Sequence, residues 1–279
     1  MKYVLFNELS NNGKGKVGVD DLVKTFGDAE YEEVSLINLD VKEFEKKLTS
    51  KDELYLVGGD GTLNHFVNDF DCDNLKPKAF IYSAGTGNDF LNDVAPNEKL
   101  VQINDYIKNL PTVYVNDLKR KFINGVGYGI DGYCCEVADQ MKEKTDKDIN
   151  YARIAIKGIL FKFKKRKAVI KVDGIEYHFN HVWLAASMNG KCYGGGMQVA
   201  PKQHRLEKEK RLTLCVFKGR SKLGTLMVFP KIFEGKLENY PKHVTYLTGK
   251  EIEVSFDNPC ALQIDGETVL NVSSYKAVA

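Results

Sequence analysis

The segment of the chain with the clearest capacity for chemistry is Leu-Val-Gly-Gly-Asp-Gly-Thr-Leu-Asn, at residues 56–64. An apolar, strand-like stretch ends in this segment and a helix-like stretch begins in it. Glycines let the backbone turn sharply and approach a ligand, and free amides at a helix start favour phosphate. Asp60 would repel phosphate, so its presence predicts a Mg²⁺ ion between the two groups. The alternative is a tight turn that binds nothing.

Two other loops carry similar residues after a strand. Residues 81–90 read Ile-Tyr-Ser-Ala-Gly-Thr-Gly-Asn-Asp-Phe, and the first strand is followed by a polar loop that also contains glycine. The carboxyl ends of parallel strands share one sheet edge, where ligands usually bind. The three loops therefore predict a nucleotide site. Its expected residues are Asn7, Ser10, Asn11, Gly58, Gly59, Asp60, Gly61, Thr62, Leu63, Asn64, Thr86, Asn88 and Asp89, with Asp60 also the metal ligand.

A pair of acids near the end of the chain is the candidate for proton transfer. Asp265 and Glu267 flank Gly266. A positioned carboxylate base typically accelerates a reaction by ~10²–10⁴-fold. In an extended turn both acids would share a face, and in a tight turn only one of them would reach a substrate. The alternative is a surface hairpin, for which Asp-Gly is a common signal.

The elements that must position these residues change character along the chain. The first part alternates strands with helices, which predicts a parallel sheet covered by helices. After about Thr112 the strands are short and separated by turn residues, which predicts an antiparallel sandwich or barrel. The sequence therefore predicts an α/β domain over residues 1–115 and a β-sandwich domain over residues 116–279.

The composition limits which classes of partner the chain is expected to bind. The 40 basic and 38 acidic side chains leave a net charge of +2, which gives no global field that would attract nucleic acid. The six cysteines form no CxxC pair, so we expect reduced thiols in a cytoplasmic protein and no zinc site. We find neither a signal peptide nor an apolar run of ~18 residues, so we expect contact with membranes to be peripheral.

One segment combines apolar and basic residues. Residues 151–167 read YARIAIKGILFKFKKRK, with apolar residues at helical spacing and a basic end. A helix that contacts anionic lipid is one interpretation, since each surface lysine adds roughly 1 kcal/mol. The alternative, which we favour, is a core-packed helix with a solvated basic end. One segment could serve both roles. We predict weak, salt-sensitive membrane association centred on Lys162 to Lys167.

Together the motifs resemble a known family. GGDGTLN followed by SAGTGNDF resembles the diacylglycerol kinase catalytic-domain family, which includes bacterial lipid kinases and is related to sphingosine kinases. Further matches follow in order and extend the resemblance from about Tyr3 to Glu267. They are Phe122-Ile123-Asn124 with Gly127, Gly129 and Asp131; Tyr193-Gly194-Gly195-Gly196-Met197 with Ala200-Pro201; and Gln263-Ile264-Asp265-Gly266-Glu267.

The resemblance implies a fold and an activity. The first domain would be a phosphofructokinase-type α/β nucleotide domain and the second a β-sandwich, with the active site in a cleft between them. ATP would bind to the Asn7 loop, to residues 58–64 and to Thr86. The acid turn would supply the proton acceptor, with a slight preference for Glu267. The expected reaction is the Mg²⁺-dependent transfer of the γ-phosphate of ATP to a hydroxyl of diacylglycerol or a similar lipid.

The chain also departs from the family pattern. His65 stands where the family usually has Glu, and Leu91-Asn92 where an Arg is usual. Many bacterial members carry an Asp-Asp-Gly stretch that holds a structural Mg²⁺, whereas residues 202–211 here contain no aspartate, which leaves that second site open. The chain ends twelve residues after Glu267, so truncation also stays open.

Other functions remain as alternatives. A non-catalytic lipid- or nucleotide-binding relative and an NAD kinase both fit part of the pattern. Gly127 to Gly132 matches GxGxxG, but this motif follows a complete α/β half, which argues against a dinucleotide-binding dehydrogenase. The sequence does not identify the lipid, and it leaves open whether an unpaired sheet edge joins copies into a homo-oligomer.

Overall fold

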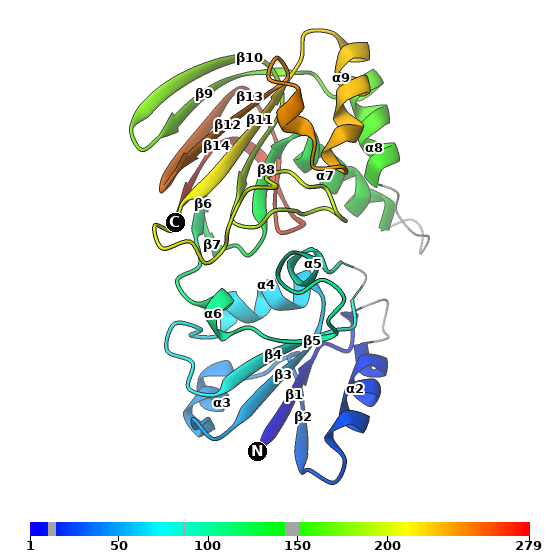
Figure 1. Ribbon diagram of the computed structural model, residues 1–279, viewed down its shortest axis with the longest axis vertical. Helices are drawn as coiled ribbons and strands as arrows, with labels where there is room; N and C mark the ends of the chain where they lie inside the picture. The colour runs from blue at the N-terminus through cyan, green and yellow to red at the C-terminus, as the bar shows by residue number, and fades with distance from the viewer. Residues whose placement is uncertain (11–14, 86, 143–150) are drawn as a thin grey trace. The chain divides into compact units, whose positions relative to one another are not determined.

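The structure, a computed structural model, describes residues 1–10, 15–85, 87–142 and 151–279 (Figure 1). The chain forms two compact units, Met1–Leu110 and Pro111–Ala279. This division lies five residues before the boundary drawn from the sequence, because strand β6 (Thr112–Val115) pairs with strands of the second unit. The predicted fold class, an α/β domain followed by an antiparallel β domain, is confirmed.

The first unit is a five-stranded sheet in the order β2-β1-β3-β4-β5. All neighbouring pairs are parallel except β4 with β5. The strands are β1 (Lys2–Phe6), β2 (Tyr31–Ser35), β3 (Glu53–Gly58), β4 (Lys78–Ser83) and β5 (Leu100–Gln102). The helices are α2 (Gly15–Val23), η1 (Lys24–Phe26), α3 (Val41–Lys47), α4 (Asp60–Asp69), α5 (Asp89–Val94) and α6 (Asn104–Ile107).

Strand β1 shows how the sheet is covered on both faces. Val4 and Phe6 pack in one cluster with Val19 and Leu22 of α2. Tyr3 lies in an edge-to-face contact with Phe44 of α3, with 5.2 Å between ring centroids. Successive side chains of a strand point to opposite faces, so a mostly apolar strand binds helices on both sides.

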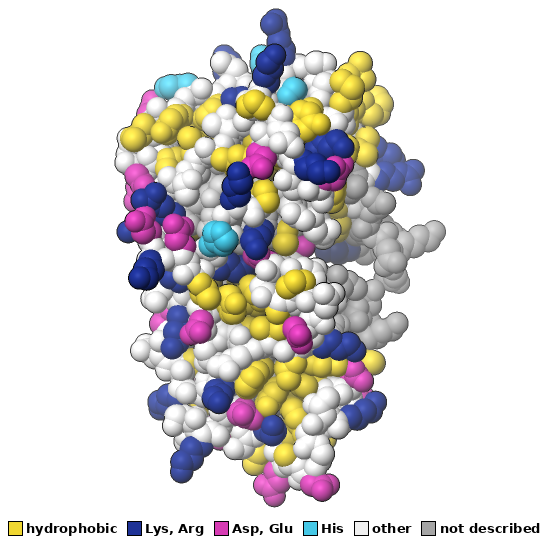
Figure 2. Space-filling view, in the orientation of Figure 1, with side chains coloured by type: hydrophobic (Ala, Val, Ile, Leu, Met, Phe, Trp, Pro, Cys, Tyr) yellow, Lys and Arg dark blue, Asp and Glu magenta, His cyan; other side chains and the backbone are white. Residues whose placement is uncertain are grey.

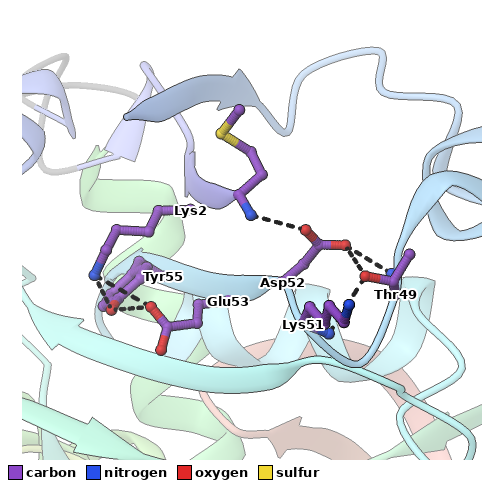
Figure 3. A network of polar contacts seen from close by, with 7 residues as sticks. Lys2, Thr49, Lys51, Asp52, Glu53 and Tyr55 are labelled. Atoms are coloured by element: carbon purple, nitrogen blue, oxygen red, sulfur yellow. Dashed lines mark hydrogen bonds and ion pairs between the residues drawn. The ribbon is translucent and has the colours of Figure 1, made fainter. Parts of the chain in front are cut away.

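The amino ends of β1 and β3 are joined by a polar network (Figure 3). Asp52 accepts hydrogen bonds of 2.7 Å from the side chain and the backbone of Thr49 and one of 3.0 Å from the amino group of Met1. These bonds, the one from the Thr49 hydroxyl first, lower the pKa of Asp52 to about 2. The opposite, carboxyl ends of these strands carry the candidate loops.

The second unit is an antiparallel sheet in the order β12-β11-β10-β8-β13-β14-β6-β7, with β9 paired to both β10 and β13. Besides β6, its strands are β7 (Leu118–Lys121), β8 (Gly125–Gly129), β9 (Arg166–Val172), β10 (Ile175–Met188), β11 (Leu212–Lys218), β12 (Val244–Gly249), β13 (Glu251–Ile264) and β14 (Glu267–Val278). One core cluster, which includes Tyr128, Ile170 and Val254, is built from residues of these strands.

Helices form a second core against this sheet. They are α7 (Ile130–Lys142), α8 (Tyr151–Lys157), the π-helix η2 (Gly158–Lys162), α9 (Lys222–Val228), η3 (Phe229–Ile232) and η4 (Leu237–Asn239). Ile159 and Phe163 are buried here beside Trp183, so the core-packed interpretation of residues 151–167 holds for these side chains. Among the described residues, no helix is both long and apolar enough to cross a membrane.

Candidate active site

The loops after β3 and β4 touch backbone to backbone. The amide of Asp60 donates to the carbonyl of Gly87 at 2.9 Å, and the amide of Ala84 donates to Gly58 at 3.2 Å. A Cβ on Gly59 would lie 2.3 Å from the Gly87 oxygen, and one on Gly85 would lie 2.8 Å from the Gly59 Cα. Both glycines are therefore required by this close approach.

Asp60 links the two loops through its side chain. Its Oδ2 accepts a hydrogen bond from the amide of Asp89 at 2.7 Å, and its Oδ1 accepts one from the amide of Phe90 at 3.0 Å. The carboxylate thus holds the start of α5 from across the loop. Each carboxylate oxygen keeps a further lone pair, so the residue also fits the predicted role of Mg²⁺ ligand.

The start of α4 is open on one side. Gly59 precedes the helix and its cap position carries no side-chain hydrogen bond. Gly61 is exposed, and a Cβ added to it would meet no atom within 4 Å among the described residues. Thr62 folds over Gly58, whose added Cβ would lie 2.4 Å from the Thr62 hydroxyl. An exposed glycine and open space at a helix start suit a phosphate group.

The loop after β1 lies at the same sheet edge, because β1 is parallel to its neighbour β3. Asn7 Oδ1 accepts from the amide of Leu9 at 2.9 Å, and the Ser10 hydroxyl donates to the Asn7 carbonyl at 2.7 Å. A Cβ on Gly15 would lie 2.0 Å from that carbonyl, so helix α2 starts directly against the loop. The predicted site residues Asn11 and Thr86 lie outside the described residues.

The remaining predicted nucleotide residues differ in access. Asn88 donates to the Gly85 carbonyl at 2.8 Å, while its buried Oδ1 has no donor within the described part of the chain. Leu63 and Asn64 are 0% exposed, and Asp89 is 4% exposed. In this structure Leu63 and Asn64 pack inside the unit, so their contact with a nucleotide stays a prediction without structural support.

In the second unit, the acid turn is a two-residue hairpin between β13 and β14. Asp265 and Gly266 both have positive φ, 47° and 94°. Positive φ at both central positions is typical of the type I′ turn that joins tightly coupled antiparallel strands. Asp173 and Gly174 form a similar turn, with φ of 48° and 83°. The hairpin interpretation of the motif is therefore correct for the backbone.

The two acids have different surroundings. The Asp265 carboxylate accepts from three successive amides, those of Ile123 at 2.6 Å, Asn124 at 2.8 Å and Gly125 at 3.0 Å. Glu267 is 44% exposed in its side chain, and its Oε2 lies 3.8 Å from Nη1 of Arg120. Asp265 thus positions residues 123–125, whereas the side chain of Glu267 is partly exposed to solvent.

Buried polar residues stabilise the Asp265-Gly266 turn through hydrogen bonds. Gln263 accepts from the amide of Gly266 at 2.6 Å and donates to Oδ2 of Asp131 at 2.8 Å. Both side chains are buried, and burial raises the pKa of Asp131 to about 6. Thr268, just after the turn, donates to Asp139 of α7 at 2.6 Å. Asp131 and Gln263 were part of the family resemblance, but nothing in their spacing indicated this chain of contacts.

The stretch 202–211 contributes a cation where the family pattern has acids. Arg205 donates to the Ile123 carbonyl at 2.6 Å and to Oδ1 of Asn124 at 2.7 Å. A Cβ on Gly190 would lie 2.0 Å from this guanidinium. Among the described residues no three His, Cys, Asp or Glu side chains gather as a metal site. The residues here do not fit a second, structural Mg²⁺.

Family models cover nearly the whole chain. The model described as "Diacylglycerol kinase catalytic domain" matches residues 2–121. The model described as "YegS C-terminal NAD kinase beta sandwich-like domain" matches residues 124–278, more than half of the chain. The junction of the two matches falls just before the amides that Asp265 binds.

Individual relatives agree with these models. A protein of Staphylococcus aureus strain Newman named "Putative lipid kinase" is 25% identical over 227 residues, which are 78% of this chain and 72% of the relative. One from Staphylococcus carnosus with the same name is 24% identical over 231 residues, 80% of this chain and 72% of the relative. A solved "diacylglycerol kinase" structure from Bacillus anthracis covers 99% of this chain and 93% of its own, with a TM-score of 0.65 at 20% identity, which shows a shared fold.

Proposed function

Because the chain belongs to the diacylglycerol kinase catalytic-domain family, and is therefore a phosphotransferase of the kinase class, we propose that it transfers the γ-phosphate of ATP to a hydroxyl of diacylglycerol or a similar lipid. The observation that carries this proposal is the direct backbone contact of the Gly59 and Gly85 loops beside the open start of α4. Glycines at this contact let a phosphate group approach the backbone closely at the start of the helix.

The first unit supplies the nucleotide contacts. The exposed backbone at Gly61 accommodates phosphate oxygens. Asp60 would hold Mg²⁺, which neutralises phosphate charge when bound. The hydrogen bonds from Asp89 and Phe90 fix the Asp60 carboxylate, so its orientation does not have to be ordered during the reaction.

The second unit supplies the base. A lipid hydroxyl is a poor nucleophile until its proton has an acceptor. Glu267 is partly exposed, and its Oε2 lies 3.8 Å from Nη1 of Arg120. Asp265 cannot turn toward a substrate without releasing three amides. We therefore assign proton transfer to Glu267 and positioning of the turn to Asp265. The lipid would be met peripherally, at a membrane surface.

A substrate panel tests this function. Purified protein is incubated with radiolabelled ATP and Mg²⁺ and with diacylglycerol, a sphingoid base or NAD, and labelled product is separated. Label in diacylglycerol that disappears in Glu267→Gln supports the proposal. Label in NAD alone would make the chain an NAD kinase, and ATP binding without any labelled product would make it a non-catalytic relative.

A further inference from the structure

Helix α9 exposes apolar side chains on the face that points away from the core. Thr225 and Val228 are buried, whereas Leu223 is 72% exposed and Met227 is 74% exposed. Residues four apart lie on one face of a helix, so Leu223 and Met227 form a single outward pair. A surface helix ordinarily carries polar residues on its outer face, so this pair is unusual.

The neighbouring π-helix η2 adds a third exposed apolar side chain. Phe161 is 75% exposed, while Ile159 and Phe163 on either side of it are buried. The two segments are joined directly, because Lys222 at the start of α9 donates to the Leu160 carbonyl at 2.7 Å. We call Phe161, Leu223 and Met227 the apolar ridge.

Lysines lie on η2, on α9 and on the residues next to η2. They are Lys157, Lys162, Lys164, Lys165 and Lys222, and within the described part of the chain none of them is paired with a carboxylate. Lys165 and Lys222 donate to backbone carbonyls instead. Figure 2 shows hydrophobic side chains gathered over α9 with lysine and arginine side chains close by.

The positive charge continues beside η2. Lys162, Lys164 and Arg166 line a pocket of about 350 Å³, together with a single carboxylate, that of Glu136. The Nε atom of Arg166 is buried and has no hydrogen-bond partner among the described residues. Around His181, burial first and then the charges of Lys165 and Arg220 lower the histidine pKa, as expected in a positive local field.

We propose that the apolar ridge and its lysines dock the second unit onto an anionic bilayer, with Phe161, Leu223 and Met227 entering the acyl boundary and the lysines meeting the phosphate headgroups. We infer an anionic bilayer from charge complementarity, because unpaired lysines beside exposed apolar groups match a negatively charged membrane surface. The proposal rests on the proposed function in that a lipid kinase must meet its substrate at such a surface. It places the membrane contact on α9 as well as on the basic residues Lys162 to Lys167.

The test uses the full chain and vesicles without nucleotide. Sedimentation is compared on phosphatidylglycerol-containing vesicles and on pure phosphatidylcholine vesicles. Replacing Lys162, Lys164 and Lys165 by Gln should weaken binding to the anionic vesicles by about fivefold per lysine. Lys208→Gln, at another exposed position of the same unit, should change little. At 1 M salt, where screening shortens to ~3 Å, binding of the wild type should fall.

A separate fluorescence experiment measures whether the apolar ridge enters the bilayer. The only native tryptophan, Trp183, is 1% exposed, so Phe161→Trp adds a reporter at the ridge. Its emission should shift to the blue on anionic vesicles, whereas that of Ile175→Trp, at a 61% exposed position on the β9–β10 hairpin, should not. Equal binding to both vesicle types, or no shift at Phe161→Trp, would overturn the proposal.

Two further outcomes are informative. If Leu223→Ala with Met227→Ala converts an oligomer to a monomer in size-exclusion chromatography, the ridge binds a second copy, and the bilayer proposal is wrong. Turnover of a short-chain, water-soluble diacylglycerol should be unaffected by these ridge variants. If the wild type phosphorylates no lipid but shows ridge-dependent vesicle binding, the proposed function fails while this docking surface stands.

Discussion

Asp265 and Gly125 hold each other through a reciprocal pair of hydrogen bonds. The Gly125 amide donates to Oδ1 of Asp265 at 3.0 Å, and the Asp265 amide donates to the Gly125 carbonyl at 3.1 Å. This ring ties the acid turn to the first residue of β8, 140 residues earlier in the chain. The two acids of the turn therefore differ in kind, one serving structure and the other exposed to solvent, and they should respond differently to substitution.

Asp265→Asn should lower stability. The carboxamide keeps one acceptor oxygen and turns an NH₂ group toward an amide, so at least one buried donor loses its partner. We expect a loss of roughly 1.5–3 kcal/mol in the free energy of unfolding. Asp173→Asn is the matched control, because in that similar turn both amides, those of Lys250 and Glu251, bind the single oxygen Oδ1. Urea denaturation of both variants measures the difference, and equal losses would contradict the assigned role.

Glu267→Gln should lower turnover without lowering stability. The side chain is 44% exposed and its Oε2 lies 3.8 Å from Nη1 of Arg120, so the loss of this long, partly solvated ion pair should cost little stability. Loss of a positioned base should reduce kcat by ~10²–10⁴-fold while ATP binding is retained. Glu176→Gln, an exposed acid on another hairpin, serves as control. A wild-type rate in Glu267→Gln would remove this residue from the mechanism.

Substitutions at two glycines of the proposed nucleotide loop should distinguish a loss of ATP affinity from a loss of stability. Gly61→Ala adds a methyl group to open space inside a helix, so stability should rise by about 0.5–1 kcal/mol while ATP affinity falls. Gly59→Ala forces the loops apart at the Gly87 oxygen, so both stability and affinity should fall. Thermal melts with calorimetric titration of ATP and Mg²⁺ measure both quantities. Unchanged ATP affinity in Gly61→Ala would place the phosphates elsewhere.

Asp60→Ala should abolish activity and also weaken the first unit. The carboxylate accepts two amides at the start of α5, and losing such a cap typically costs about 0.5–2 kcal/mol. Unfolding should remain cooperative. Asp69→Ala, at the exposed far end of the same helix, should leave turnover unchanged. Chelation of Mg²⁺ should reproduce the loss of activity of Asp60→Ala without its loss of stability, and turnover in chelator would remove the metal from the reaction.

Asp131 should make stability depend on pH in an unusual direction. Its pKa is raised by burial from 3.8 to about 6, so the folded chain binds this proton more tightly than the unfolded chain does. The free energy of unfolding attributable to Asp131 therefore falls as the pH rises from about 4 to 6, by roughly 3 kcal/mol. Asp131→Asn cannot titrate at this position. Its free energy of unfolding minus that of the wild type should therefore be larger at pH 7.5 than at pH 5. The same difference at both pH values would refute the assignment.

The positions of the loops after β3 and β4 could be predicted from sequence because their signal is local. A buried strand that ends in glycines and continues as a helix specifies both the turn and the sheet edge at which it lies, as in residues 53–69. The complete burial of Asn64 could not be predicted from this local signal, because it depends on how α4 packs.

The division of roles between Asp265 and Glu267 could not be predicted in the same way. It arises from contacts with residues 123–125, which the fold brings to the turn. Likewise, Arg205 reads as one cation in a charged, exposed-looking stretch, and only the tertiary structure places it on Ile123 and Asn124.

Arg205 gives the loop at residues 123–124 a permanently attached cation. A bound ion exchanges with solvent, and its occupancy follows the free concentration, which ATP itself depletes by complexing Mg²⁺. A guanidinium stays protonated at any physiological pH and cannot diffuse away. The conformation of this loop therefore does not depend on the supply of divalent ions.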